Sequence, residues 1–247
     1  MLKEKNNVIF YDIFHKKSSA VDKIIPSNNF TYFHILKIIN RIPLGDKKIL
    51  DIGCGDGTLS LYLAANGAQV FGYDVSKLAI KIAKQTAKRL RLNSARFFYK
   101  DLENIKSIEG SFDIIICSEI LEHLKNDDLL LKLLKKALAK NGLIIVSVPS
   151  LKAPIYRLGF AKKFDFRVGH LRRYSVSSIK KAIEGVGFKI IKTYRTESIL
   201  RNSLFLFKPL GFFIKFIRGF LVKIFHVFDQ LLVLIFGESQ IFIVAKK

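Results

Sequence analysis

The chain has 247 residues, of which half are hydrophobic and a quarter charged, and its formal net charge is +22. This apolar content excludes a disordered chain, and the length suits one domain of roughly 200 residues with an appendage. Two cysteines, Cys54 and Cys117, are too few for a disulfide framework or a four-cysteine zinc site. Residues 1–7 lack the apolar core of a signal peptide, so we expect a cytoplasmic protein.

The positive charge lies mainly outside the middle of the chain. Residues 49–149 carry a net charge of only +3, because 14 basic side chains face 11 acidic ones. Residues 150–198 carry 12 basic and 3 acidic side chains, a net charge of +9. A general compositional bias would spread more evenly. The asymmetry therefore favours a basic surface for an anionic partner, either nucleic acid or an anionic membrane.

Helical and extended patterns alternate along most of the chain. We expect helices over 28–42 (capped by Asn28 or Asn29), 58–66, 76–91, 126–140 and 175–184. The short apolar runs predict strands over 48–52, 69–74, 95–99, 112–117, 143–148 and 240–244. This alternation predicts an α/β protein with a doubly wound, mostly parallel sheet, whose ligands lie at the carboxyl ends of the strands.

A glycine cluster follows the first expected strand. Gly53, Gly55 and Gly57 allow the backbone to turn tightly and to approach a ligand without a Cβ atom in the way. A dinucleotide-binding fingerprint needs glycine where Thr58 stands, and a phosphate-binding P-loop needs Gly-Lys-Ser/Thr. The spacing fits neither motif.

Motifs in a fixed order resemble those of class I S-adenosylmethionine-dependent methyltransferases. They are residues 49–60 (ILDIGCGDGTLS), Asp74 closing the second strand, Asp101-Leu102 after the third, and residues 112–124 (FDIIICSEILEHL) at the fourth. The resemblance covers roughly residues 45–195 and implies a Rossmann-like sheet of seven strands with S-adenosylmethionine as cofactor. It implies that the cofactor contacts Asp51, Gly53, Gly55, Gly57, Asp74, Asp101, Leu102 and Ser118.

The resemblance also divides the chain into parts. Residues 1–45 would form an N-terminal helical cap, and residues 46–198 the cofactor-binding core, with a lid at about 150–178. Residues 199–237 would be an amphipathic helical insertion, and residues 238–247 would return to the core as the last strand. The alternative for the whole set, an ordinary glycine turn with solvated aspartates, does not explain several motifs in order.

The first candidate catalytic group follows the fourth strand. A helical turn there would place Glu119, Glu122 and His123 on one face. Glu-x-x-Glu-His resembles the pattern of polyprenyl-quinone O-methyltransferases, where it is associated with metal, yet Glu-His is common in the wider family without one. We expect His123 to act as a base or to orient the acceptor, and we do not favour a metal on these three residues.

The second candidate group is Gly169-His-Leu-Arg-Arg-Tyr-Ser175, which resembles the lid segment of the same family. This resemblance implies that His170 reaches the methyl acceptor and that Arg172, Arg173 and Tyr174 bind it. The alternative is a lid histidine that only packs. Methyl transfer itself asks mainly for alignment, and a base is needed only where the acceptor loses a proton.

The segment from Ile199 to Gly237 is rich in phenylalanine, but its charges interrupt every run long enough to span a membrane. On a helical wheel the polar residues fall within an arc of about 140°, and the rest is almost entirely apolar. These polar residues are Lys208, Lys215, Arg218, Lys223, His226 and Asp229. The pattern favours a helix lying in a bilayer interface over one packed on the sheet or at a dimer interface.

These features predict a methyltransferase that lies on the inner face of the cytoplasmic membrane. Its acceptor would be an isoprenoid quinone precursor, a lipid or a lipid-linked sugar, with oxygen as the favoured atom. One alternative is an RNA methyltransferase that uses the basic flanks on phosphates. Another is a membrane-bound module that binds S-adenosylmethionine without turnover.

Overall fold

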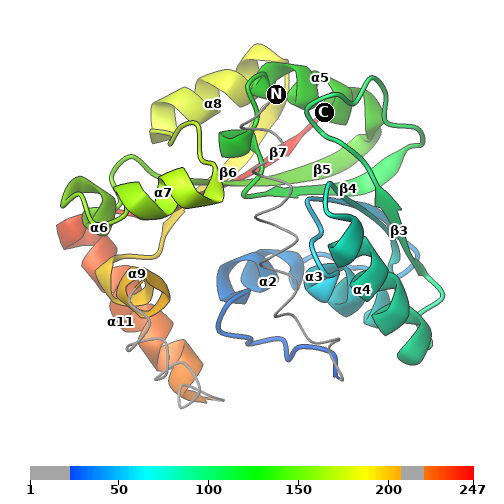
Figure 1. Ribbon diagram of the computed structural model, residues 1–247, viewed down its shortest axis with the longest axis horizontal. Coiled ribbons are helices and arrows are strands. Elements are labelled where there is room, and N and C mark those ends of the chain that lie inside the picture. Colours follow the sequence, from blue (N-terminus) through cyan, green and yellow to red (C-terminus); the bar gives the residue numbers. More distant parts are fainter. Residues whose placement is uncertain (1–22, 207–219) are drawn as a thin grey trace.

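The computed structural model describes residues 23–206 and 220–247. Seven strands form one sheet in the order β3-β2-β1-β4-β5-β7-β6 (Figure 1). Strands β1 to β5 pair in parallel, and β7 runs antiparallel to both β5 and β6. Their bounds are β1 Lys48–Ile52, β2 Gln69–Asp74, β3 Ala95–Tyr99, β4 Phe112–Ser118, β5 Leu138–Pro149, β6 Lys189–Thr196 and β7 Gln240–Lys246. The predicted α/β fold with a seven-stranded, mostly parallel sheet is confirmed.

Helices cover both faces of this sheet (Figure 1). On one face, α2 (Phe33–Ile39) and α3 (Thr58–Ala65) bury apolar side chains against the central strands, and α4 (Lys77–Arg89) packs beside them on β3. On the other face lie α5 (Asp127–Ala137) and α8 (Val176–Gly185). Ser76 and Ser175 cap α4 and α8, as the sequence predicts.

Helices α5 and α2 are shorter than predicted, and α2 ends at Ile39 rather than at residue 42. Helix α5 ends at Ala137 rather than at residue 140, because Asn141 and Gly142 lie inside β5 instead of closing the helix. A Cβ atom on Gly142 would stand 3.0 Å from the Asp113 carbonyl oxygen, so this glycine serves a close approach of two strands. Helix α2 begins only at Phe33, after a turn in which the Asn29 side chain accepts backbone hydrogen bonds from Thr31 and Tyr32.

Four helices lie beyond the carboxyl ends of the strands, where the lid and the insertion were predicted (Figure 1). The lid contains α6 (Pro154–Arg157) and α7 (Lys162–Val168), and the insertion contains α9 (Ile199–Leu206) and α11 (Phe220–Phe236). Within the described residues, no helix is long and apolar enough to cross a membrane.

Part of the insertion's polar arc is buried where the structure describes it, and its predicted place in a bilayer interface stays a prediction. His226 and Asp229 belong to that arc, yet both are buried against the protein rather than turned to solvent. Lys223 is exposed. Lys208, Lys215 and Arg218 lie outside the described residues.

Candidate functional site

The glycine loop joins the ends of two neighbouring strands. Gly53 has a φ of +74° and donates its backbone N–H to the Tyr73 carbonyl at 2.8 Å. The Gly55 N–H donates to Asp74 Oδ2 at 2.8 Å, and Ser76 N–H donates to Asp74 Oδ1 at the same distance. The Asp74 carboxylate is therefore held in place beside the loop, and its contact with a cofactor stays a prediction.

Asp51 lies beneath this loop rather than on its surface. Its carboxylate is buried and accepts a 2.6 Å hydrogen bond from the Ser60 hydroxyl. Burial raises the pKa of Asp51 to about 6. A cofactor ammonium would stabilise the ionised form, but in this structure the main partner of Asp51 is Ser60.

Tyr32 is a residue of this region that the sequence did not indicate. It stands just before α2, yet its hydroxyl bonds the Thr58 side chain at the start of α3. Burial first, and then the charges of Asp56 and Asp51, raise the pKa of Tyr32 well above its usual value. The segment before α2 therefore covers the glycine loop, and no local sequence signal joins positions so far apart.

The remaining predicted cofactor residues line the same edge of the sheet. Asp101 follows β3 and accepts hydrogen bonds from the Glu103 N–H at 3.0 Å and from the Asn104 side chain at 2.8 Å. Leu102 is buried next to it. The Ser118 hydroxyl at the end of β4 is joined to the Ser147 hydroxyl of β5 at 2.7 Å. Their cofactor contacts stay predictions, as do those of Gly53, Gly55 and Gly57.

Two carboxyl groups follow β4, one half-buried and one fully buried. Glu119 has a φ of +56°, and its Oε1 accepts hydrogen bonds from the Ser147 hydroxyl at 3.3 Å and from the Gln240 amide. Burial raises the pKa of Glu119 to about 7. Glu122, in the short 3-10 helix η1 (Leu121–His123), is fully buried, and neither carboxyl oxygen has a hydrogen-bond partner. Burial, and then the charge of Glu119, raise its pKa well above the usual value.

The stability of the protein should depend on the proton of Glu119. Its raised folded-state pKa means that the folded chain keeps a proton which the unfolded chain releases, so this contribution is complete below about pH 4.5 and is lost as pH rises toward 7. The loss amounts to roughly 1 kcal/mol per pH unit in that window. Glu119→Gln mimics the protonated carboxyl group and cannot titrate. In urea unfolding between pH 5 and 7, the free energy of unfolding should therefore fall less steeply with pH in the variant than in the wild-type protein. Equal slopes would contradict the prediction.

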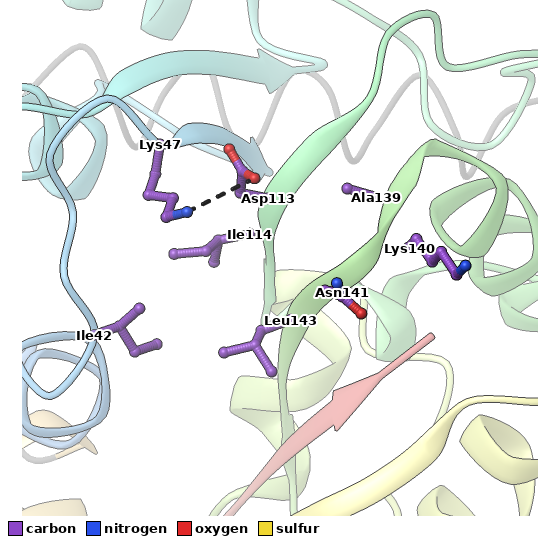
Figure 2. Close-up of a pocket in the computed structure, with 8 residues that line it drawn as sticks. All are labelled: Ile42, Lys47, Asp113, Ile114, Ala139, Lys140, Asn141 and Leu143. Carbon is purple, nitrogen blue, oxygen red and sulfur yellow. Dashed lines mark ion pairs between the residues drawn. The ribbon is translucent and has the colours of Figure 1, made fainter.

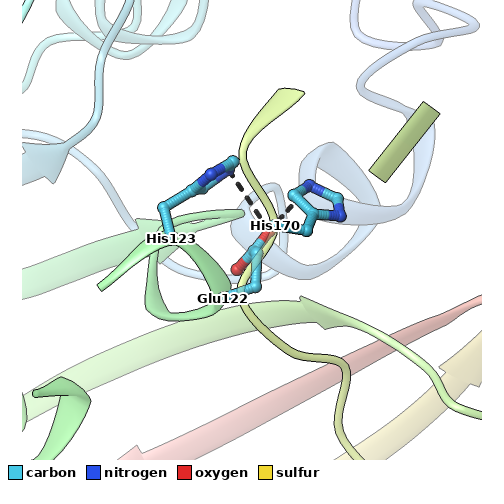
Figure 3. Close-up of side chains that lie close together, drawn as sticks. All are labelled: Glu122, His123 and His170. Atoms are coloured by element: carbon cyan, nitrogen blue, oxygen red, sulfur yellow. Dashed lines mark ion pairs between the residues drawn. The ribbon is translucent and has the colours of Figure 1, made fainter. Parts of the chain in front are cut away.

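Glu122 brings the two predicted catalytic histidines together (Figure 3). The Nε2 atoms of His123 and His170 each lie 3.9 Å from Glu122 Oε1, and the ring centroids are 4.8 Å apart. Burial, and then His170, lower the pKa of His123 to about 4, which keeps its imidazole neutral. A hydrogen bond from the Leu171 N–H to the Glu122 carbonyl, 2.8 Å long, holds the lid over this cluster.

His170 is oriented by Asp165, which the sequence did not indicate. His170 Nδ1 lies 3.1 Å from Asp165 Oδ1. Arg173 donates two hydrogen bonds of 2.7 Å to the same carboxylate, and its guanidinium lies over the Tyr156 ring. Hydrogen bonds from His170 and Arg173 lower the pKa of Asp165, although burial opposes them. An ionised Asp165 assigns the proton to Nδ1 and leaves Nε2, which faces Glu122, as the acceptor.

Of the three residues predicted to bind substrate, Arg172 and Tyr174 hold the lid to the core, and Arg173 bonds within the lid. Arg172 forms an ion pair with Asp127 at 3.1 Å and donates to the Lys125 carbonyl at 2.9 Å. The buried Tyr174 hydroxyl lies 2.6 Å from Asp127 Oδ2 and 3.2 Å from the Leu121 carbonyl. Arg173 is engaged with Asp165, as described above. Their polar groups already have protein partners, and a role in binding substrate stays a prediction.

The described residues bring together a different metal-ligand set from the one considered in the sequence. Glu122, His123 and His170 each offer an atom, and these atoms lie within 4.8 Å of one another, whereas Glu119 bonds elsewhere. One carboxylate and two imidazoles suit a divalent cation, which would act as a Lewis acid on an acceptor oxygen. Glu122 would have to be ionised, and its raised pKa opposes this.

Two cavities differ in their position relative to the strands. One, of about 450 Å³, is lined by residues at the amino ends of β1 and β4, among them Lys47 and Asp113, which form an ion pair at 4.0 Å (Figure 2). The other, of about 240 Å³, lies under α7 and is lined by Tyr156, Phe166 and His170 among others. Ligands of doubly wound sheets lie at the carboxyl ends, so the cavity at His170 is the better candidate.

Comparison with known proteins finds matches over much of the chain. A family model of the methyltransferase domain matches residues 30–193. A ubiquinone biosynthesis O-methyltransferase of Glaesserella parasuis serovar 5 (strain SH0165) is 33% identical over 144 residues, which are 54% of this chain and 61% of that protein. One of Pelagibacter ubique (strain HTCC1062) is 38% identical over 138 residues, 51% of this chain and 56% of that protein. The matches therefore span little more than half the length of these relatives.

A solved structure supports the fold of the described residues. Magnesium protoporphyrin IX methyltransferase from Synechocystis PCC 6803, with bound SAH, superposes with a TM-score of 0.65. The alignment covers 100% of this chain and 98% of that one at 18% identity. At this identity the likeness concerns the fold, so the chemistry must be argued from the residues around Glu122.

Proposed function

The chain belongs to the methyltransferase domain family and to its class I, S-adenosylmethionine-dependent type, and from this premise we propose that it methylates a hydroxyl oxygen of a lipid-like or lipid-linked acceptor. The observation that carries the proposal is the Asp165–His170 pair. It leaves Nε2 of a half-buried imidazole as a proton acceptor beside His123 and Glu122, whose pKa is raised by burial. A hydroxyl must lose its proton as it is methylated, and a positioned imidazole is suited to accept it.

The proposed roles divide between two sides of the site. S-adenosylmethionine supplies the methyl group as an electrophile when bound at the glycine loop, beside Asp74. His170 takes the proton of the methyl acceptor at Nε2. His123 and Glu122 line the space in which the acceptor oxygen must lie. The names of the two ubiquinone biosynthesis relatives support oxygen as the acceptor atom and a polyprenyl-quinone precursor as the acceptor class.

The proposal also places the protein on the inner face of the cytoplasmic membrane. Apolar acceptors reside in the bilayer, and an enzyme that binds its surface meets them at high local concentration. The net charge of +22 supports attraction to anionic lipid, at about 1 kcal/mol for each basic residue near the surface. The charge equally suits RNA, but an RNA substrate leaves the apolar insertion without a role.

Labelled S-adenosylmethionine tests the proposal with total lipid and total RNA extracts offered separately. We expect label in the lipid fraction, linked as a methyl ether, and its loss in His170→Gln. Turnover should persist in the presence of a chelator, because proton transfer to His170 needs no cation. If a chelator abolished turnover and a divalent cation restored it, Glu122, His123 and His170 would instead be a metal site. Label in RNA alone would contradict the proposal, and cofactor binding with no labelled product would favour a non-catalytic module.

A further inference from the structure

Helix α11 has an inverted distribution of polar residues. Its buried positions recur every three or four residues and include two polar side chains: Val222, His226, Asp229 and Val233. Its exposed positions follow the same period but are almost all apolar: Leu221, Ile224, Val227, Phe228, Leu231, Leu234, Ile235 and Phe236. We call this second set the α11 outer face. Leu234 is 81% exposed, although burying it would be favourable.

Polar contacts fix the helix in this orientation. Asp229 accepts hydrogen bonds from the Ser198 N–H at 2.8 Å and the Arg201 N–H at 3.2 Å, at the beginning of α9. His226 stacks on Phe33 with ring centroids 4.0 Å apart. Gln230 donates to the Arg195 carbonyl at 2.8 Å. Because Asp229 and His226 would lose these partners on rotation, the outer face is held away from the protein body.

The carboxyl end of α11 meets the lid, which exposes apolar side chains of its own. A Cβ atom on Gly237, just after α11, would lie 2.9 Å from the Lys152 carbonyl oxygen, so the helix ends against the start of the lid. Helix α6 packs on α9, and all four helices lie at one end of the molecule (Figure 1). The lid exposes Leu158, Phe160 and Phe166, the last to 82%. Such a patch on a soluble surface marks an interaction site.

The exposed charges of these two segments have one sign. Within residues 151–167 and 221–236 every charged side chain that is exposed is basic: Lys152, Arg157, Lys162, Lys163, Arg167 and Lys223. The acidic residues of the same segments, Asp165 and Asp229, are buried and engaged. Apolar side chains mixed with cations match the acyl chains and phosphates of an anionic bilayer.

We infer that the α11 outer face and the lid residues Leu158, Phe160 and Phe166 form one surface that inserts into an anionic lipid bilayer. The inference rests on the proposed function and adds the surface of contact. It also gives the acceptor a route, because Phe166 and His170 line the same cavity under α7. An acceptor whose apolar part stays among the acyl chains would reach His170 at the lid without crossing water.

Fluorescence tests the contact directly, because the chain has no tryptophan. We expect the tryptophan of Leu231→Trp or Leu234→Trp to shift to shorter wavelength on vesicles of phosphatidylcholine and phosphatidylglycerol, and to be quenched by lipids brominated on the acyl chain. Ile191→Trp is the matched control, since Ile191 is 54% exposed on β6, outside this surface, and should show neither change. The protein should bind vesicles of pure phosphatidylcholine at least about tenfold more weakly than the anionic vesicles.

Co-flotation with the same vesicles measures the energetic importance of the face. Leu231→Glu/Leu234→Glu should lower the bound fraction by about tenfold or more, whereas Ile191→Glu should leave it unchanged. Vesicle binding that persists without quenching at 231 and 234 would overturn the inference. The inference would also be overturned if Leu231→Glu/Leu234→Glu left the bound fraction unaltered and converted a dimer to a monomer in lipid-free buffer. The α11 outer face would then be an interface with a second copy of the chain. Neither measurement depends on turnover. If the protein binds vesicles but methylates no lipid, the proposed function is refuted and the membrane contact stands.

Discussion

Gly53→Ala is expected to weaken S-adenosylmethionine binding by about a hundredfold while leaving the sheet folded. Two causes act together. A residue with a side chain at a φ of +74° costs roughly 1–2 kcal/mol, and the added Cβ would stand 2.0 Å from the Ile120 side chain. Relief requires the loop or Ile120 to move, and both lie beside the predicted cofactor site near the end of β4. Calorimetric titration with S-adenosylmethionine measures the loss.

Two further variants separate strain from collision. Gly159→Ala, at a φ of +84° with nothing within 4 Å of the new Cβ, suffers backbone strain without a clash and should bind cofactor normally. Gly53→Ala/Ile120→Ala removes the clashing side chain and should recover part of the affinity. Wild-type affinity in the single Gly53→Ala variant would show that the glycine loop does not hold the cofactor.

The fold was predictable because each strand can be recognised from its own short stretch of sequence. Ile114 to Ile116 in β4 form a continuous apolar run, and β1 carries Ile49, Leu50 and Ile52 with only Asp51 among them, as strands buried on both faces tend to. The chemistry of the glycine loop was equally local, since Gly53 to Gly57 follow β1 without a gap. Such signals depend on neighbours in the chain and not on how distant segments pack.

The missed features depend on how the folded chain brings particular side chains together. Tyr32 reaches Thr58, and Arg173 and His170 converge on Asp165, through folding that no local pattern encodes. The helical wheel of the insertion showed two faces correctly but could not say which one meets the protein. That choice was made by Ser198 and Arg201, whose backbone N–H groups need the carboxylate of Asp229. A buried polar arc is possible only where such partners exist.

The proposed chemistry depends most on Asp165, although it would not touch the acceptor. Asp165→Asn keeps the size of the side chain but replaces the carboxylate that accepts the Nδ1 proton of His170. The amide can donate to Nδ1, which moves the proton to Nε2 and removes the base. We expect kcat for methylation of the labelled lipid acceptor to fall by about 10²–10⁴, the range known for general-base histidines and for the loss of an orienting aspartate. The dissociation constant of S-adenosylmethionine should not change, since Asp165 lies in the lid.

The Asp165→Asn variant needs a readout that a merely structural effect would not produce. Nitrogen NMR of His170 should show the proton on Nδ1 in the wild-type protein and on Nε2 in the variant, whether or not an acceptor is present. Asp165→Asn combined with His170→Gln should be no slower than His170→Gln alone, because both changes remove the same group. Asp128→Asn, at an exposed carboxylate paired with Lys132, is the matched control and should retain full activity. If the two losses were instead additive, Asp165 would serve only to anchor Arg173 and the lid, and the acceptor proton would have to leave by another group.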